Sequence, residues 1–191
     1  MTVDELYERI DENSLRLIAI DGRCGSGKTT LAEWLRQKSG GIVVHMDDFY
    51  LQPWQRTPER YATPGENVDH ERFLEEVLKP IKEKKFFSYH AYDAHAMRMK
   101  EEAIAVDFRK LVIVEGSYSL HPDLRPYYQL KIFLDIDPKL QYTRLRKRDL
   151  HKLDDFLTKW IPLEEAYFNS MNIREVADVV LHAEDIRPSI R

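Results

Sequence analysis

Eight consecutive residues near the start of the chain have the types and the spacing needed to bind the phosphates of a nucleotide. They match the pattern G-x-x-x-x-G-K-[ST] at every fixed position. Glycines let the backbone curl so that successive N–H groups face phosphate oxygens, and the helix that follows adds its positive N-terminal end. Lys28 would reach the outer phosphates of ATP or GTP, and the Thr29 hydroxyl would hold Mg²⁺. The predicted nucleotide-binding residues are Gly22, Arg23, Cys24, Gly25, Ser26, Gly27, Lys28, Thr29 and Thr30.

The alternative interpretation is a chance glycine turn between two ordinary elements. A true phosphate loop needs a strand before it and a helix after it. Leu15 to Ile20 (LRLIAI) is mostly apolar, as in a buried strand, and apolar residues at helical spacing after Lys28 predict a helix that ends at Gly40-Gly41. Because strand, loop and helix follow in this order, the sequence favours triphosphate binding.

Carboxylates follow two further predicted strands. Asp47-Asp48 comes after the strand at 42–46, and Glu115 follows the very apolar stretch 111–114. The carboxyl ends of parallel strands meet at one edge of a sheet, so these acids would converge on the triphosphate. We assign Glu115 to the metal with Thr29, and Asp47 to the role of general base. Acids at strand ends can also cap helices or face solvent, and Asp48 could cap the segment that follows it.

The whole chain alternates between predicted strands and helices, which is typical of an α/β fold with a mainly parallel sheet and helices on both faces. We therefore expect a single P-loop NTPase domain over residues 1–191. Two segments resist assignment: 50–68 is broken by prolines, and 86–107 is either a hairpin or a strand followed by a loop. The other predicted elements are an opening helix that ends near Asn13, helices at 70–84 and 140–153, and strands at 131–136 and 176–181.

Composition limits the partners of the protein. With 33 acidic and 29 basic side chains, the formal charge of −4 gives no general attraction to nucleic acid or to anionic membranes. The single cysteine, Cys24, excludes an intramolecular disulfide, and no stretch reaches about 18 apolar residues. We expect a cytoplasmic protein that acts on a small molecule. The sequence is compatible with either a monomer or a homo-oligomer.

Several short motifs resemble those of one enzyme family. Asp47-Asp48-Phe49-Tyr50 is similar to the Asp-Ser-Phe-Tyr signature of uridine kinases, and Val68-Asp69-His70 is similar to their Phe-Asp-His. Val114-Glu115-Gly116 resembles their Val-Glu-Gly, and 144–149 (RLRKRD) resembles the Arg-rich helix that leads into their lid. From about Leu15 to Asp149 the chain thus resembles the uridine kinase branch of the P-loop kinases, which also includes phosphoribulokinase and bacterial pantothenate kinase.

The resemblance implies roles for residues on the acceptor side. It makes Asp47 the catalytic base, counts Asp47 and Tyr50 among the substrate-binding residues and assigns Asp69 to the ribose of a nucleoside. Arg144 and Arg148 are four residues apart, so they would share a helix face that covers the transferred phosphate, although an ordinary solvated face has the same spacing. The predicted catalytic residues are Lys28, Asp47, Arg144 and Arg148.

The chain departs from the family pattern at two places. The lid expected around 144–158 lacks the family's Arg-Gly-Arg. The family also has a Tyr-Asp-aromatic segment followed at some distance by a His. Here the corresponding segment is Tyr92-Asp93-Ala94-His95, in which the aromatic residue is lost and the His is closer. Tyr92 and His95 either line an acceptor pocket or pack.

The leading hypothesis is an ATP- and Mg²⁺-dependent kinase that phosphorylates a hydroxyl of a small acceptor, with a nucleoside as the first candidate. The alternatives are a pantothenate-like or phosphosugar acceptor, or a regulatory ATPase without an acceptor. A regulatory ATPase would not need a base aimed at a third site.

Overall fold

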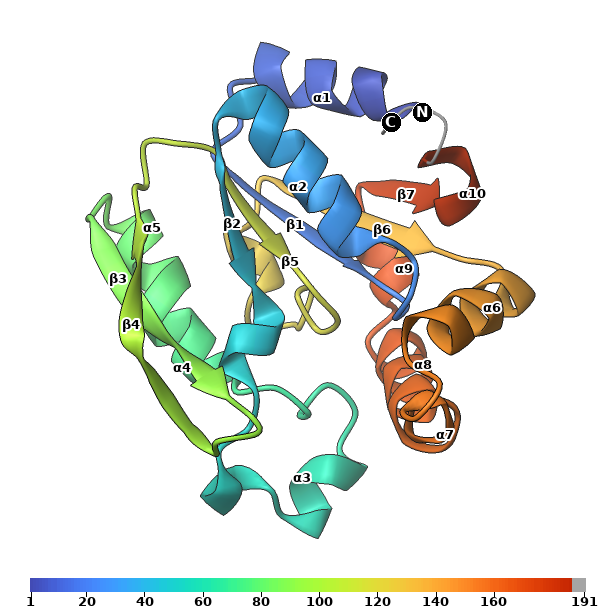
Figure 1. The fold of residues 1–191 in the computed structure, drawn as a ribbon. Helices are drawn as coiled ribbons and strands as arrows, with labels where there is room; N and C mark the ends of the chain where they lie inside the picture. The colour runs from blue at the N-terminus through green and yellow to red at the C-terminus, as the bar shows by residue number, and fades with distance from the viewer. Residues whose placement is uncertain (187–191) are drawn as a thin grey trace.

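A five-stranded parallel sheet lies at the centre of the computed structural model, which describes residues 1–186 (Figure 1). The strand order is β2-β5-β1-β6-β7, and every neighbouring pair is parallel. The α/β fold with a mainly parallel sheet that the sequence predicts is therefore confirmed. The strands are β1 (Leu17–Gly22), β2 (Ile42–His45), β5 (Val112–Glu115), β6 (Leu130–Asp135) and β7 (Val179–His182).

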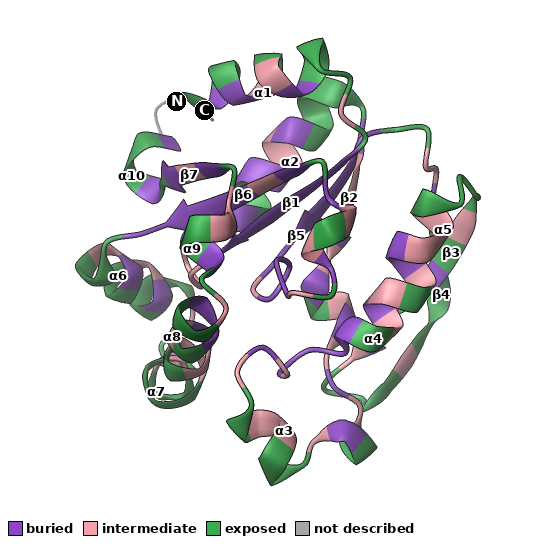
Figure 2. Ribbon diagram, turned by 180° about the vertical axis from the view of Figure 1, so that it is seen from behind, coloured by how far each residue is buried: buried purple, intermediate pink, exposed green. Residues whose placement is uncertain are grey.

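Helices cover both faces of this sheet, because neighbouring residues of a strand point to opposite sides. α1 (Val3–Glu12) and α2 (Lys28–Ser39) pack on one face. The helical segment 70–82, α8 (Ile161–Ser170) and α9 (Ile173–Val176) pack on the other. Figure 2 shows the central strands β1 and β5 as buried between these two layers, as expected for inner strands of a parallel sheet, whereas the edge strand β2 is mostly half-buried.

The predicted helix at 70–84 and the open segment at 86–107 form a subdomain beside β2. The helix consists of α4 (His70–Phe73), a π-helical turn (Leu74–Leu78) and α5 (Lys79–Lys82). The open segment is an antiparallel hairpin of β3 (Phe87–Asp93) and β4 (Arg98–Val106). Tyr89 of β3 packs into the same core as the helix.

The proline-rich segment 50–68 leaves the sheet edge and returns to it. It contains a 3₁₀ turn (Pro53–Gln55) and α3 (Pro58–Ala62), and a bridge between Tyr50 and Val68 closes its base. Pro53 and Pro58 stand at the first positions of these two helical pieces, where a missing N–H costs nothing. A 3₁₀ turn (Met46–Phe49) joins β2 to the segment.

The C-terminal third differs from the prediction in three ways. α6 (Pro138–Arg148) ends five residues before the predicted end at 153, and Asp149 with extended backbone terminates it. A further helix that was not among the predicted elements follows, formed by α7 (Leu153–Asp155), a π-helical turn (Phe156–Trp160) and α8.

The last predicted strand, 176–181, begins only at Val179 because α9 occupies its first residue. α10 (Ala183–Ile186) and a 3₁₀ turn (Arg125–Tyr127) complete the described elements. Within residues 1–186, the helices are too short or too polar to span a lipid bilayer.

At two strand ends the following loop packs so closely against a neighbouring segment that only glycine fits. Gly22 ends β1 with φ +140°, and a Cβ built there would lie 2.1 Å from the carbonyl oxygen of Leu134. Gly116 follows β5 with φ +139°, and its Cβ would lie 2.7 Å from Cβ of Met46. No other residue fits either position without moving backbone.

Gly22→Ala should therefore lower the free energy of unfolding by at least about 3 kcal/mol, through steric overlap and a backbone conformation that alanine rarely adopts. Gly40→Ala is the matched control, because Gly40 also has positive φ (+66°) but no atom near its added Cβ. The control should lose only about 1 to 2 kcal/mol. Urea denaturation measures both, and equal losses would contradict the role given to the clash with Leu134.

Candidate active site

The phosphate loop is formed at the carboxyl edge of the sheet, between β1 and α2, as the motif requires. Gly25 and Gly27 adopt positive φ (+74° and +105°), and α2 begins at Lys28. The first-turn N–H groups of α2 have no partner within the helix and are available to an anion. Ser26 is buried, and its hydroxyl has no hydrogen-bond partner among residues 1–186. This orphaned polar atom inside a glycine cradle fits a bound phosphate.

The side chain of Lys28 is hydrogen-bonded to the backbone of the phosphate loop. Its ammonium group donates to the carbonyl oxygens of Gly22 (2.7 Å) and Arg23 (3.1 Å) and contacts the Ser117 hydroxyl at 3.4 Å. Lys28 is 8% exposed. Its charge therefore lies at the base of the cradle, where phosphate oxygens would meet it.

Thr29, Glu115 and His45 form a hydrogen-bonded chain beside the loop. The Thr29 hydroxyl donates to Oε1 of Glu115 at 3.1 Å, and Nδ1 of His45 lies 2.6 Å from the same oxygen. A hydroxyl and a carboxylate are the hard oxygen donors that Mg²⁺ prefers, so Thr29 and Glu115 fit the metal role predicted for them. The hydrogen bond with Glu115 raises the pKa of His45, although burial opposes it.

Sequence reasoning did not single out His45. The signal was nevertheless available, because His45 and Glu115 are the last residues of neighbouring parallel strands and pair in register. Residues that end adjacent parallel strands lie side by side at the ligand-binding edge.

Asp47 lies within electrostatic reach of Glu115 and His45, two members of this hydrogen-bonded chain, and is exposed to solvent. Protein atoms around it nevertheless remove part of its hydration, and this loss raises the pKa of the Asp47 carboxyl. The negative charge of Glu115 raises it further, while the positive charges of Lys28, His45 and Arg148 oppose the shift. The structure thus brings Asp47, Lys28, Glu115 and Arg148 within electrostatic reach of one another.

The two arginines of α6 point to different partners. Arg144 donates to the carbonyl oxygens of Gly25 (3.1 Å) and Ser26 (2.9 Å), so it braces the phosphate loop from outside. Arg148 is exposed and acts on Asp47 through its charge. The two arginines thus flank the phosphate loop and the Asp47 carboxylate, respectively.

Acidic residues of α8 hold the rest of the loop, and sequence reasoning missed them. Glu164 is buried, and it accepts hydrogen bonds from the Cys24 N–H (2.9 Å) and the Ser117 hydroxyl (2.5 Å). Arg23 is bound by Glu165 and by Asp135 at the end of β6. The helix 161–170 carried no motif, so only the fold could place these acids.

Burial raises the pKa of the Cys24 thiol to about 12, and the negative charge of Glu164 adds to this effect. A thiol with so high a pKa is not a nucleophile at neutral pH. Cys24 is therefore a small residue of the loop wall.

Asp21, directly before the loop, is fully buried. Its carboxylate accepts hydrogen bonds from the N–H groups of Gly22 (2.7 Å) and Leu120 (2.9 Å) and from the Tyr167 hydroxyl (2.8 Å). Burial raises the pKa of Asp21 to about 6, although these hydrogen bonds and the charge of Lys28 oppose the shift. One carboxylate thus joins β1, the loop after β5 and α8.

Aromatic residues and one arginine gather on the acceptor side. The guanidinium of Arg56 lies 4.9 Å from the ring centroid of Tyr50 and 5.9 Å from that of Tyr92, and it reaches the Tyr92 hydroxyl at 3.4 Å. Trp160 packs edge-on against Tyr50, with ring centroids 6.1 Å apart. The segment 50–62, β3 and the helix after α6 therefore meet at these rings. Sequence reasoning named Tyr50 and Tyr92 but not Arg56 or Trp160.

Three other acidic or titratable residues of the acceptor side have local partners. Asp69 is buried and caps α4 by accepting from the Arg72 N–H at 3.1 Å. Asp48 accepts from the Tyr89 hydroxyl at 2.9 Å. His95 is exposed in the turn of the β3–β4 hairpin, which Asp93 holds through the His95 N–H.

Comparison with known proteins agrees with this geometry. Residues 17–169 match the Phosphoribulokinase / Uridine kinase family. The chain belongs to this family. Family membership and the shared fold make it a P-loop kinase by relationship.

Individual relatives are distant. The chain is 28% identical to a uridine kinase of Clostridium botulinum strain 657 over 181 residues, which cover 86% of each chain. It is 34% identical over 184 residues to the tRNA-specific adenosine deaminase subunit tad2 of Schizosaccharomyces pombe, where the match covers 86% of this chain and 43% of that protein. A solved structure described as a possible uridine kinase from Bacillus stearothermophilus superposes with a TM-score of 0.71 at 22% identity, covering 94% and 96% of the two chains. At these identities the likeness supports a kinase but does not name its acceptor.

The raised pKa of Asp21 predicts a definite pH dependence of stability. Between pH 3.8 and about 6 the folded state binds more protons at Asp21 than the unfolded state does, so its contribution falls as pH rises through this window. Relative to Asp21→Asn, the wild-type protein should lose up to about 3 kcal/mol of unfolding free energy from pH 4 to pH 7. Urea titrations at several pH values measure this difference, and a constant offset between the two proteins would contradict it.

Proposed function

We propose that the protein transfers the γ-phosphate of ATP to a hydroxyl group of a small acceptor. The observation that carries the proposal is the convergence of Lys28, Thr29, Glu115, Asp47 and Arg148 on one phosphate loop. A regulatory ATPase needs the first three of these groups but does not need a base for the hydroxyl of a third substrate. We further propose that residues 1–191 form one kinase domain and that the protein acts in the cytoplasm.

In the proposed reaction the loop N–H groups and Lys28 hold the phosphates of ATP, and Arg148 balances charge on the transferred group. Mg²⁺, held by Thr29 and Glu115, would neutralise negative charge on the phosphate oxygens. Asp47 accepts the proton of the acceptor hydroxyl while the hydroxyl oxygen bonds to the γ-phosphorus. The bond between that phosphorus and the β-phosphate oxygen breaks, and ADP leaves. A raised pKa makes Asp47 a better proton acceptor than an ordinary aspartate.

A nucleoside is the first acceptor to test, because the half-buried rings of Tyr50 and Trp160 could pack against a flat base. Relatives named uridine kinase support this choice. Arg56 favours a second candidate, since a guanidinium between two tyrosine rings suits an acceptor with a phosphate or carboxylate, such as a phosphosugar or a pantothenate-like compound.

The acceptor can be identified by following ADP release. The protein is incubated with Mg-ATP and a panel of nucleosides, phosphosugars and pantothenate, and the expected result is turnover that depends on one class of acceptor. An anionic acceptor should lose most of its advantage in Arg56→Gln, whereas a neutral nucleoside should be affected less. ATP hydrolysis that no acceptor stimulates would favour the regulatory ATPase instead.

Lys28→Ala and Asp47→Asn should each lower turnover by at least about a hundredfold, because one removes a phosphate contact and the other the base. Asp48→Asn is the matched control, since Asp48 is a neighbouring carboxylate hydrogen-bonded to Tyr89. A normal rate for Asp47→Asn together with a large loss for Asp48→Asn would transfer the role of base to Asp48.

A further inference from the structure

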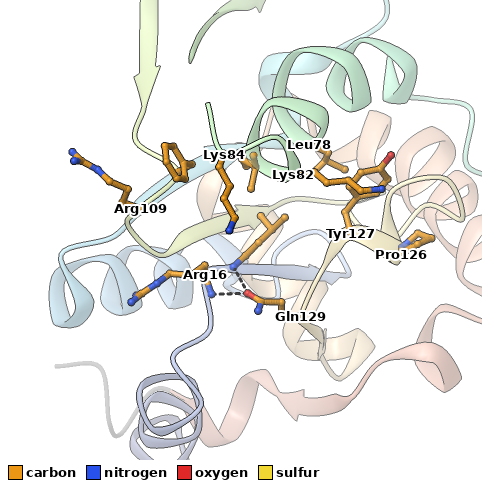
Figure 3. Close-up of a pocket in the computed structure, with 11 residues that line it drawn as sticks. Arg16, Leu78, Lys82, Lys84, Arg109, Pro126, Tyr127 and Gln129 are labelled. Atoms are coloured by element: carbon orange, nitrogen blue, oxygen red, sulfur yellow. Dashed lines mark hydrogen bonds between the residues drawn. The ribbon is translucent and has the colours of Figure 1, made fainter. Parts of the chain in front are cut away.

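A cavity lies at the amino ends of the parallel strands, at the opposite edge of the sheet from the phosphate loop (Figure 3). Its volume is about 780 Å³, within the range of about 300–1,000 Å³ that small-molecule sites occupy. Arg16 and Leu17 enter it from the start of β1, and Gln129 from the residue before β6. The α5 end and the loop before β5 supply the opposite wall.

The cavity has an apolar floor and a basic rim. Leu17 and Leu78 are buried at its base, and Ile81, Phe108 and Tyr127 are half-buried in its walls. Four cationic side chains line it and no acidic one does, and all four are exposed: Arg16, Lys82, Lys84 and Arg109.

Nearby carboxylates leave much of this positive charge uncompensated. Asp107 pairs with Arg109 at 2.8 Å, and Glu83 pairs with Lys85, outside the cavity, at 2.5 Å. Among residues 1–186, Arg16 and Lys84 have no carboxylate in ion-pair contact. Lys82 lies 5.3 Å from the centroid of the Tyr127 ring, at the cavity wall.

Lys84 occupies an unusual position for a lysine. Its φ is +57°, in the left-handed region that favours glycine, and its N–H closes the end of α5 by donating to the Ile81 carbonyl at 3.0 Å. A glycine would form the same turn with less strain. The turn therefore does not call for lysine, and the side chain contributes a cation to the cavity rim.

We propose that this cavity binds a small organic anion, with a flat apolar body on the floor and a carboxylate, phosphate or sulfonate against Arg16 and Lys84. The apolar body would displace water from Leu78 and Phe108, and it could stack beside Tyr127. The anionic group would meet cations that have no partner of their own. Because the cavity lies at the other edge of the sheet, this site is independent of the proposed kinase reaction.

The test uses a fluorescent anion of this class, 8-anilinonaphthalene-1-sulfonate, with the full chain and saturating Mg-ADP to block the nucleotide site. Its neutral counterpart, N-phenyl-1-naphthylamine, has the same apolar body without the sulfonate. We expect saturable binding of the anion at one site, affinity for the neutral compound weaker by at least about tenfold, and weaker anion binding at high salt.

Two variants locate the site. Lys84→Gly combined with Arg16→Ala should weaken binding of the anion by at least about tenfold, because both unpaired cations are removed. Lys84→Gly also relieves the left-handed lysine, so the melting temperature of the double variant should not fall. Lys85→Ala is the matched control: it removes an adjacent cation that does not line the cavity, and it should bind like the wild type.

Equal binding of the anionic and neutral compounds would overturn the proposal, as would equal affinity in the wild type and the double variant. Loss of binding in Lys85→Ala to the same extent would also overturn it, because nonspecific attraction to a basic surface would then explain the data. Kinase turnover without the anion should be the same in the wild type and in both variants, which separates this result from the proposed function.

Discussion

The buried carboxylate of Asp21 is the constraint on which the site depends. A charge without water is costly, and here hydrogen bonds from Gly22, Leu120 and Tyr167 offset that cost. These three donors come from the phosphate loop, the loop after β5 and α8. Their relative positions are therefore fixed by one group. Glu164 lies one helical turn before Tyr167, so the same anchor places its carboxylate against the Cys24 N–H.

The parallel sheet then determines which residues meet. β2, β5, β6 and β7 each end in a polar residue at the active edge, and neighbouring ends lie in register, as His45 and Glu115 do. Gly22 and Gly116 allow the chain to turn away within a van der Waals contact of the next strand or loop. Functional groups that are 70 residues apart in sequence consequently share one hydrogen bond. The hairpin and the proline-rich segment lie outside this frame and carry the residues of the proposed acceptor side.

Local patterns in the sequence predicted the sheet, the phosphate loop and the carboxylates at the strand ends, because each depends on nearby residues. The ends of α6 and β7 were wrong: no proline or glycine marks the residues after Arg148, and apolar residues in α9 resemble the start of a strand. Glu164 and Arg56 could not be found, since their importance arises from contacts with segments distant in the chain. The two arginines of α6 were expected to act together, yet the helix directs them to different partners.

The different partners of Arg144 and Arg148 give α6 two roles at the site. Arg144 donates hydrogen bonds to the backbone of the phosphate loop. Arg148, one turn later on the same helix, lowers the pKa of Asp47, the proposed base, through its positive charge. The position of α6 therefore fixes both the brace on the phosphate loop and the distance of a positive charge from Asp47. One short helix thus supports the phosphate-binding half of the site and the proposed base together.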